Sequence, residues 1–213
     1  MMYFITSSHQ FGFKKSHSTT LCTFIVNETI QYYINNDSSV ASVLLDASKA
    51  FDRVEYVKLF RLLQKRNICP VIARFLINLY TSQNIRVKWS NITSLHFSIC
   101  NDVKQGGMLS LILFTVYVDE LLQRLCDCNS GCYIASQFHG AYGYADDIIL
   151  LAPSLTSLRR LLDVCSNFAC EFKVMFNATK SKMILFNNRH DITRIRFMNE
   201  YIQVVPYYGQ VFR

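Results

Sequence analysis

The spacing of apolar residues switches between a helical and a strand-like period along the chain, which predicts a mixed α/β fold. Helical spacing recurs in five segments, some of them preceded by Ser or Thr or opened by Pro, as helix starts often are. The expected helices cover residues 20–34, 54–66, 70–80, 109–125 and 154–170. In the second of them, Val57, Phe60 and Leu63 form the expected inward face.

Short segments that are apolar throughout, or in which apolar and polar residues alternate, predict the strands. We expect strands over residues 40–45, 182–186, 194–198 and 201–205, and hairpins from 85–89 with 95–99 and within 142–151. Arg86 and Lys88 share one face of the first hairpin beside aromatic residues, which suits a polynucleotide backbone; the alternative is an ordinary exposed basic face. The antiparallel hairpins indicate an α+β architecture.

Two adjacent aspartates, Asp146 and Asp147, interrupt the most apolar of these hairpins at its expected tip. An unpaired charge in an apolar segment is strongly disfavoured, so a positive partner is expected there. A divalent metal ion is the simplest such partner, since carboxylate oxygens are its usual ligands. The alternative is that the pair only forms a turn.

Composition narrows the class of protein. Hydrophobic residues make up 51% of the 213 residues and charged residues only 17%, as in a packed globular protein. We expect neither a membrane span nor a secretory signal, and therefore a nuclear or cytoplasmic location. The formal net charge of +7 fits a nucleic-acid partner, although a generic basic protein has the same charge.

Eight cysteines lie mostly in apolar segments, and a core of this size needs no disulfides. We therefore expect reduced, buried thiols. Cys126, Cys128 and Cys132 match no standard zinc spacing, which favours structural cysteines over a metal cluster.

A third aspartate, Asp46, follows the apolar run 40–45. Phosphoryl transfer by two metal ions needs carboxylates from separate strands that converge on ions about 3.5–4 Å apart. If the strand before Asp46 lies beside the hairpin that carries Asp146 and Asp147, the three side chains meet that requirement.

Five motifs in chain order resemble those of reverse transcriptases from non-LTR (LINE-type) retrotransposons. The segment 43–52 (VLLDASKAFD) resembles motif A, 103–110 (VKQGGMLS) motif B and 144–147 (YADD) motif C. The segment 177–186 (NATKSKMILF) is similar to motif D, and 207–209 (YYG) to the start of motif E, the primer grip. Residues 10–20 resemble the fingers segment that precedes motif A.

This resemblance implies an RNA-directed DNA polymerase that extends a primer 3′-OH on an RNA template, with two Mg²⁺ ions or Mn²⁺ in their place. Asp46 and Asp146 are then the principal metal ligands, and Asp147 is the second carboxylate or a turn residue that supports Asp146. Phe51 matches the steric gate that selects deoxynucleotides; its alternative is core packing. Gln105 and Gly106 line the nucleotide pocket.

The resemblance also assigns roles to the basic residues. Lys180 matches a lysine that protonates pyrophosphate, and Lys182 is the second candidate for that role. The alternative for either lysine is a plain surface charge. Lys14 and Lys15 fall where the fingers contact the triphosphate, and they too have a surface alternative. The implied primer grip consists of Tyr207, Tyr208 and Gly209.

The implied fold is the right-hand polymerase fold without a thumb, with an antiparallel palm sheet and packed helices. Fingers are expected over about 1–38 and 67–101, and palm over about 39–66 and 102–213. Motif B departs from the family, because Gly107 stands where an acidic or small residue is common and Leu111 replaces a proline. With fingers strands expected to be missing before Met1 and the chain ending inside motif E, we expect a fragment of a retrotransposon reading frame.

Two other interpretations remain open. One is a catalytically inert remnant that binds nucleic acid without positioning a primer. The other is a telomerase-like or group II intron-type polymerase, which is less favoured because residues 48–52 are nearest to LINE-type motif A. The sequence does not indicate an oligomeric state.

Overall fold

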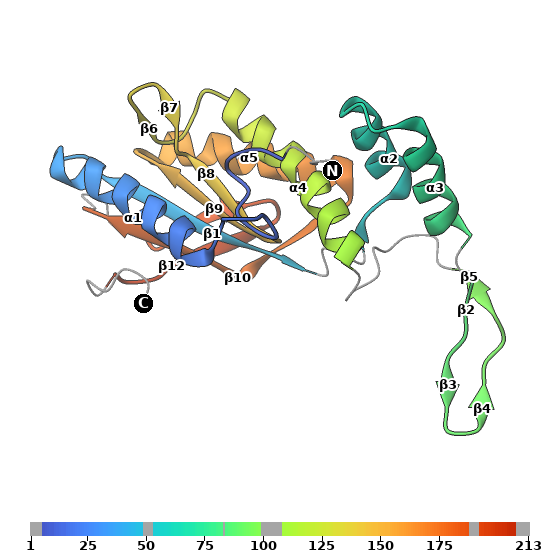
Figure 1. Ribbon diagram of the computed structural model, residues 1–213. Helices are drawn as coiled ribbons and strands as arrows, with labels where there is room; N and C mark the ends of the chain where they lie inside the picture. The colour runs from blue at the N-terminus through green and yellow to red at the C-terminus, as the bar shows by residue number, and fades with distance from the viewer. Residues whose placement is uncertain (1–5, 49–52, 83, 99–107, 188–191, 208–213) are drawn as a thin grey trace.

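A six-stranded sheet organises the computed structural model, which describes residues 6–48, 53–82, 84–98, 108–187 and 192–207 (Figure 1). The strand order is β11-β12-β10-β1-β9-β8. Neighbouring strands are antiparallel, apart from the parallel pair β10–β12. The strands are β1 (Val40–Ser48), β8 (Ala141–Tyr144), β9 (Asp147–Ala152), β10 (Met175–Phe186), β11 (Arg194–Phe197) and β12 (Glu200–Val204).

Helices cover both faces of this sheet, so successive strand residues enter different cores. α4 (Met108–Asp127) and α5 (Leu155–Phe172) cover one face, and α1 (Thr19–Asn35) covers part of the other. On β9, Ile148 and Leu150 pack toward α4 and α5, whereas Leu151 belongs to the core beneath α1. The mostly antiparallel sheet with packed helices confirms the predicted fold class.

Helix boundaries follow the capping signals closely. The Ser18 side chain accepts a hydrogen bond from the Leu21 N–H at the start of α1, and Ser154 accepts one from the Ser157 N–H at the start of α5. Pro70 opens α3 (Pro70–Thr81), as predicted.

The predicted inward face of α2 (Tyr56–Lys65) was wrong in one position. Val57 is 63% exposed, and the buried stripe consists of Tyr56, Leu59, Leu62 and Leu63. These four residues recur at intervals of three or four and so share one side of the helix, while Val57 lies outside that stripe. Phe60 packs only at the margin of the core.

The predicted pairing of residues 85–89 with 95–99 is confirmed at Ile85, which pairs with Phe97, but was wrong for residues 88–89, which pair with 92–93 nearer the tip. The hairpin forms two short ladders, β2 (Asn84–Ile85) with β5 (Phe97–Ser98) and β3 (Lys88–Trp89) with β4 (Ile92–Thr93). This hairpin projects away from the sheet, beyond α3 (Figure 1). A further small hairpin, β6 (Tyr133–Ile134) and β7 (Gln137–Phe138), lies between α4 and β8 and was not predicted.

Every cysteine in the described ranges is a free thiol. Cys22, Cys132 and Cys165 are buried, but the expected burial was wrong for Cys69 and Cys170, which lie on the outer surface at α3 and α5. Burial raises the pKa of the Cys132 thiol to about 12, which keeps it protonated and unreactive. Within the same ranges, no helix combines the length and the apolar character that crossing a membrane requires.

Strand β1 offers a direct test of whether successive strand residues enter different cores, because its neighbouring residues Leu44 and Leu45 face opposite sides of the sheet. Leu45 is fully buried and Leu44 is 42% exposed. Leu45→Ala should lower the free energy of unfolding by about 2–5 kcal/mol, since it leaves a cavity between β1 and the helices. Leu44→Ala should change it by less than about 0.5 kcal/mol. Urea denaturation of both variants measures the difference; equal losses would contradict the assigned faces of β1.

Candidate active site

The β8–β9 hairpin presents the two adjacent aspartates at its tip. Tyr144 pairs with Asp147, so Ala145 and Asp146 form a two-residue turn. Ala145 has a φ of 60°, a left-handed conformation that tight hairpin turns require and that costs energy for a residue with a Cβ. The predicted placement of Asp146 and Asp147 at a hairpin tip is therefore what the structure shows.

Asp46 lies at the same end of the neighbouring strand. Leu45 of β1 pairs with Ile148 of β9, and the next residue toward the tip is Asp46 on one strand and Asp147 on the other. The antiparallel pairing of β1 and β9 thus brings Asp46, Asp146 and Asp147 to one edge of the sheet, although they are about one hundred positions apart in the chain.

Asp147 interacts electrostatically with the other two carboxyl groups. Partial burial raises the pKa of Asp147, and the negative charges of Asp146 and Asp46 raise it further. Among the described residues, no three His, Cys, Asp or Glu side chains are grouped closely enough to hold a metal ion as they stand. The donor set still fits a hard divalent cation, because it consists of carboxylate oxygens whose mutual repulsion such a cation relieves.

A bulge in β10 supports Asp46 from the other side. Leu44 pairs with Lys182 and Asp46 with Asn177, so residues 178–181 of β10 lie opposite the single residue Leu45. The Asp46 N–H donates to the Ser181 hydroxyl at 3.1 Å, and that hydroxyl donates to the Asn177 carbonyl at 2.7 Å. Ser181 was not predicted as part of this site, because only the strand register shows that it contacts β1.

The predicted lysines lie in different settings. Lys180 is exposed on the bulge, and the Lys182 ammonium donates to the Thr179 carbonyl at 3.1 Å. The Lys14 ammonium donates to the Ser7 carbonyl at 2.9 Å, and partial burial lowers its pKa although the negative charge of Asp119 opposes this. Lys15 is exposed.

Tyr207 is the one remaining predicted site residue that lies within the described ranges, and it is not brought to the carboxylates. The Tyr207 ring contacts the Phe186 ring, with centroids 4.7 Å apart, and Phe186 pairs with Val40 at the opposite end of β1 from Asp46. Other predicted positions lie outside the described residues, namely Phe51, Gln105, Gly106, Tyr208 and Gly209. Leu111, the position of the expected proline, lies in the first turn of α4.

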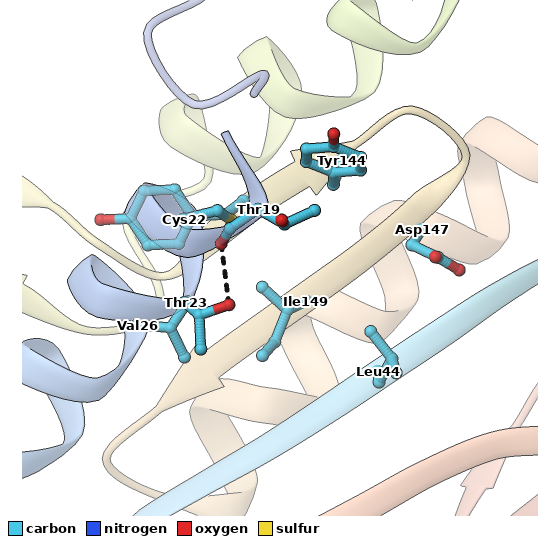
Figure 2. A pocket seen from close by; sticks show the side chains of 9 residues that line it. Thr19, Cys22, Thr23, Val26, Leu44, Tyr144, Asp147 and Ile149 are labelled. Carbon is cyan, nitrogen blue, oxygen red and sulfur yellow. Dashed lines mark hydrogen bonds between the residues drawn. The ribbon is translucent and has the colours of Figure 1, made fainter. Parts of the chain in front are cut away.

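A cavity of about 230 Å³ lies beside Asp147, between α1 and the sheet (Figure 2). Its walls include Val26 of α1 and Leu44 and Ile149 of the sheet, with Tyr144 near the hairpin tip. Leu44, Tyr144 and Asp147 line one open region, so an apolar surface adjoins a carboxylate. This combination suits a ligand with a ring next to a charged or metal-bound group.

The comparison with protein families decides the assignment. The profile of the reverse transcriptase (RNA-dependent DNA polymerase) family matches residues 4–205. The chain belongs to the reverse transcriptase family. The motifs at Asp46 and at Asp146–Asp147 lie within this match, which confirms the resemblance that the sequence showed.

Curated relatives of this reverse transcriptase chain come from transposable elements. The chain is 28% identical over 85% of its length to a probable RNA-directed DNA polymerase from transposon X-element of Drosophila melanogaster, covering 20% of that protein. It is 29% identical over 64% to the Pol polyprotein of the type-2 retrotransposable element R2DM of the same species, covering 13%. An uncharacterized 149 kDa protein of transposon TX1 from Xenopus laevis is 28% identical over 76%, covering 12%. The chain thus spans about 12–20% of these relatives.

Solved structures show the same fold. Apo telomerase from Candida tropicalis, truncated from its C-terminal domain, superposes with a TM-score of 0.68 at 14% identity, covering 92% of this chain and 39% of that one. Telomerase from the same species in complex with a fragment of telomeric RNA gives a TM-score of 0.66 at 12% identity, covering 89% and 32%. At these identities the likeness extends to the fold alone.

The raised pKa of Asp147 makes the stability of the metal-free protein depend on pH. A carboxyl group whose pKa is higher in the folded state binds its proton more tightly there, so its ionisation lowers stability as pH rises from about 3.9, the ordinary aspartate value, to the raised value. Asp147→Asn should therefore raise Tm at pH 7 in EDTA. The gain should disappear below about pH 3, where both states are protonated.

Thermal melts at several pH values measure this effect. Asp163→Asn, an exposed position on α5, is the matched control and should show no such pH-dependent gain. A gain for Asp147→Asn that stays constant with pH would contradict the electrostatic coupling.

Proposed function

We propose that this chain forms the polymerase core of a non-LTR retrotransposon reverse transcriptase, which adds deoxynucleotides to a primer 3′-OH on an RNA template. The observation that carries the proposal is the convergence of Asp46 with Asp146 and Asp147 at one edge of the sheet. Family membership and the transposable-element relatives support it. Such a core would act in the nucleus or the cytoplasm, where RNA and nucleotides are present.

Asp46, Asp146 and Asp147 would hold two Mg²⁺ ions, or Mn²⁺ in their place. When bound, these ions lower the pKa of the attacking hydroxyl and neutralise charge on the leaving pyrophosphate. The 3′-hydroxyl would release its proton to water, its oxygen would bond to the α-phosphorus of the incoming nucleotide, and the bond from that phosphorus to the pyrophosphate oxygen would break. The carboxylates orient the reacting groups, while Lys180, exposed on the bulge next to Asp46, would donate a proton to the departing pyrophosphate.

The apolar cavity beside Asp147 supports a role in placing the reacting sugar and base. Leu44, Ile149 and Tyr144 offer flat apolar surface within reach of the carboxylate edge. A nucleotide ring against these side chains would be shielded from water, which favours the electrostatic steps at the carboxylates.

Other parts of the proposal rest on the motifs. Phe51, Gln105 and Gly106 would form the nucleotide pocket, and Lys15, with Lys14, would approach the triphosphate. Residues 207–209 would grip the primer. The division into fingers over about 1–38 and 67–101, with the palm in the other segments, also remains a proposal.

Primer extension on an RNA template with Mg²⁺ tests the proposal. Asp146→Asn should lower the rate about 10³-fold, because the loss of a metal ligand removes several kcal/mol of transition-state stabilisation. Asp163→Asn is the matched control and should retain the wild-type rate. Equal extension by wild type and Asp146→Asn contradicts a polymerase role for the carboxylates. A wild-type chain that binds template without extending it contradicts the proposed activity and identifies an inert binding protein.

Sugar selectivity tests the role assigned to Phe51. Phe51→Ala should increase incorporation of ribonucleotides relative to deoxynucleotides, since the ring would no longer exclude the 2′-hydroxyl. Competition between the two nucleotide types in the same extension assay measures the ratio. An unchanged ratio assigns Phe51 to packing instead.

A further inference from the structure

Gln10 is a fully buried glutamine whose side chain pairs with the turn between β8 and β9. Its Oε1 accepts hydrogen bonds from the Gly12 N–H at 2.8 Å and from the Ala145 N–H at 3.2 Å. Its Nε2 donates to the Ala145 carbonyl at 3.4 Å. Buried polar groups in proteins are nearly always paired, and here one side chain pairs with both backbone groups of a single residue.

The backbone around Gln10 fixes the position of this side chain. His9 and Phe11 bond to Gly143 of β8, since the Gly143 N–H donates to the His9 carbonyl at 2.9 Å and the Phe11 N–H donates to the Gly143 carbonyl at 2.7 Å. The segment thus forms a parallel bridge on the outer edge of β8, with Gln10 opposite Gly143. The N-terminal segment is thereby attached to the strand that leads into the turn.

Gly12 brings the segment into direct contact with the turn. A Cβ at this position would lie 2.2 Å from the Ala145 N and 2.8 Å from its Cα, distances that no side chain could occupy. The neighbouring atoms are backbone and cannot rotate away. A glycine at this position therefore allows the chain to lie against Ala145 closely enough for Gln10 to reach both of its peptide groups.

The conformation of Ala145 determines where the carboxylates point. Ala145 holds a left-handed φ of 60° immediately before Asp146, and the two residues form the whole turn. Rotation of either peptide group of Ala145 would reorient Asp146 relative to Asp147 and would also break the bonds to Gln10. Buried hydrogen bonds therefore offset the strain of the left-handed residue.

We propose that Gln10 is a positioning residue that, through its paired hydrogen bonds to Ala145, holds Asp146 and Asp147 in the orientation that binds the divalent ion. The inference rests on the proposed polymerase function. Glutamine suits this task because a single amide offers a donor and an acceptor. Glutamate keeps the acceptor but loses the donor and adds negative charge near two aspartates. Methionine has a similar length and makes none of the bonds.

Direct Mn²⁺ binding, measured by the EPR signal of the free ion, tests the proposal without requiring turnover. Gln10→Met and Gln10→Glu should weaken Mn²⁺ binding about 10–100-fold, the usual effect of removing a group that orients metal ligands. In primer extension, kcat should fall by a similar factor, while KM for the nucleotide stays within about twofold, because the ligands move but the nucleotide pocket does not. Gln64→Met, an exposed glutamine on α2, is the matched control and should match wild type.

Wild-type Mn²⁺ affinity in both folded Gln10 variants overturns the proposal. Gly12→Ala gives a second test that leaves the Gln10 side chain intact. Its Cβ should push the segment away from Ala145 and weaken Mn²⁺ binding in the same way, and unchanged binding overturns the proposal. Because metal binding is measured directly, a wild-type chain that does not extend a primer would disprove only the proposed function. The role of Gln10 in metal binding is tested separately from that activity.

Hydrogen exchange on the wild-type protein keeps the proposal testable if the variants do not fold. The Ala145 amide should exchange as slowly as those of the central strand β1, since Gln10 accepts its proton in a buried setting. Exchange at the rate of an open turn overturns the proposal.

Discussion

Repulsion among three carboxylates at one edge of the sheet is the constraint on which the rest of the structure depends. Asp46 lies near the end of β1, Asp147 begins the neighbouring strand β9, and Asp146 lies in the turn between β8 and β9. Partial burial of Asp147, together with the negative charges of Asp146 and Asp46, raises the pKa of Asp147, which is an energetic cost to the metal-free fold. Apolar packing on both faces of the sheet offsets that cost, since Leu45 and Leu150 are fully buried in the core that α4 and α5 cover and Leu151 is fully buried in the core beneath α1.

Hydrogen bonds from β10 and from the N-terminal segment hold the backbone on both sides of the three carboxylates. Ser181 in the β10 bulge accepts from the Asp46 backbone, and Gln10 in the N-terminal segment pairs with Ala145 beside Asp146. Both supporting side chains are almost completely buried, at 1% and 0% exposure. The carboxylates themselves remain accessible, because Asp147 is exposed and lines the apolar cavity while Asp46 and Asp146 are partly exposed.

Much of this arrangement could be predicted from local patterns. Apolar alternation and the aspartate pair located the β8–β9 hairpin, and capping residues such as Ser18 and Ser154 located the helices. β10 was predicted from residue 182 only, because four of the residues 177–181 are polar and hide the strand pattern where the chain bulges. The turn between β6 and β7 depends on Ala135 and Ser136 at positive φ, and neither residue type signals that conformation.

Such local patterns could not predict which residues far apart in the chain pair with each other. Gln10 and Ala145 are separated by 135 positions, and their contact follows from the strand order and from the close approach at Gly12. From the sequence, the adjacency of β1 and β9 was a condition that two-metal phosphoryl transfer requires, and no residue pattern predicted it. Recognition of the family motifs supplied the functional roles, whereas the geometry supplied the contacts that support them.

A crystal structure of the wild-type chain with Mn²⁺ would show whether β1 and the β8–β9 hairpin share a metal ion, because anomalous scattering locates the ion independently of the protein atoms. We expect an anomalous peak within bonding distance of the Asp46 carboxylate and of a carboxylate from the pair Asp146–Asp147. A peak bound by only one of the two strands, or no peak at this edge at saturating Mn²⁺, would contradict a shared site.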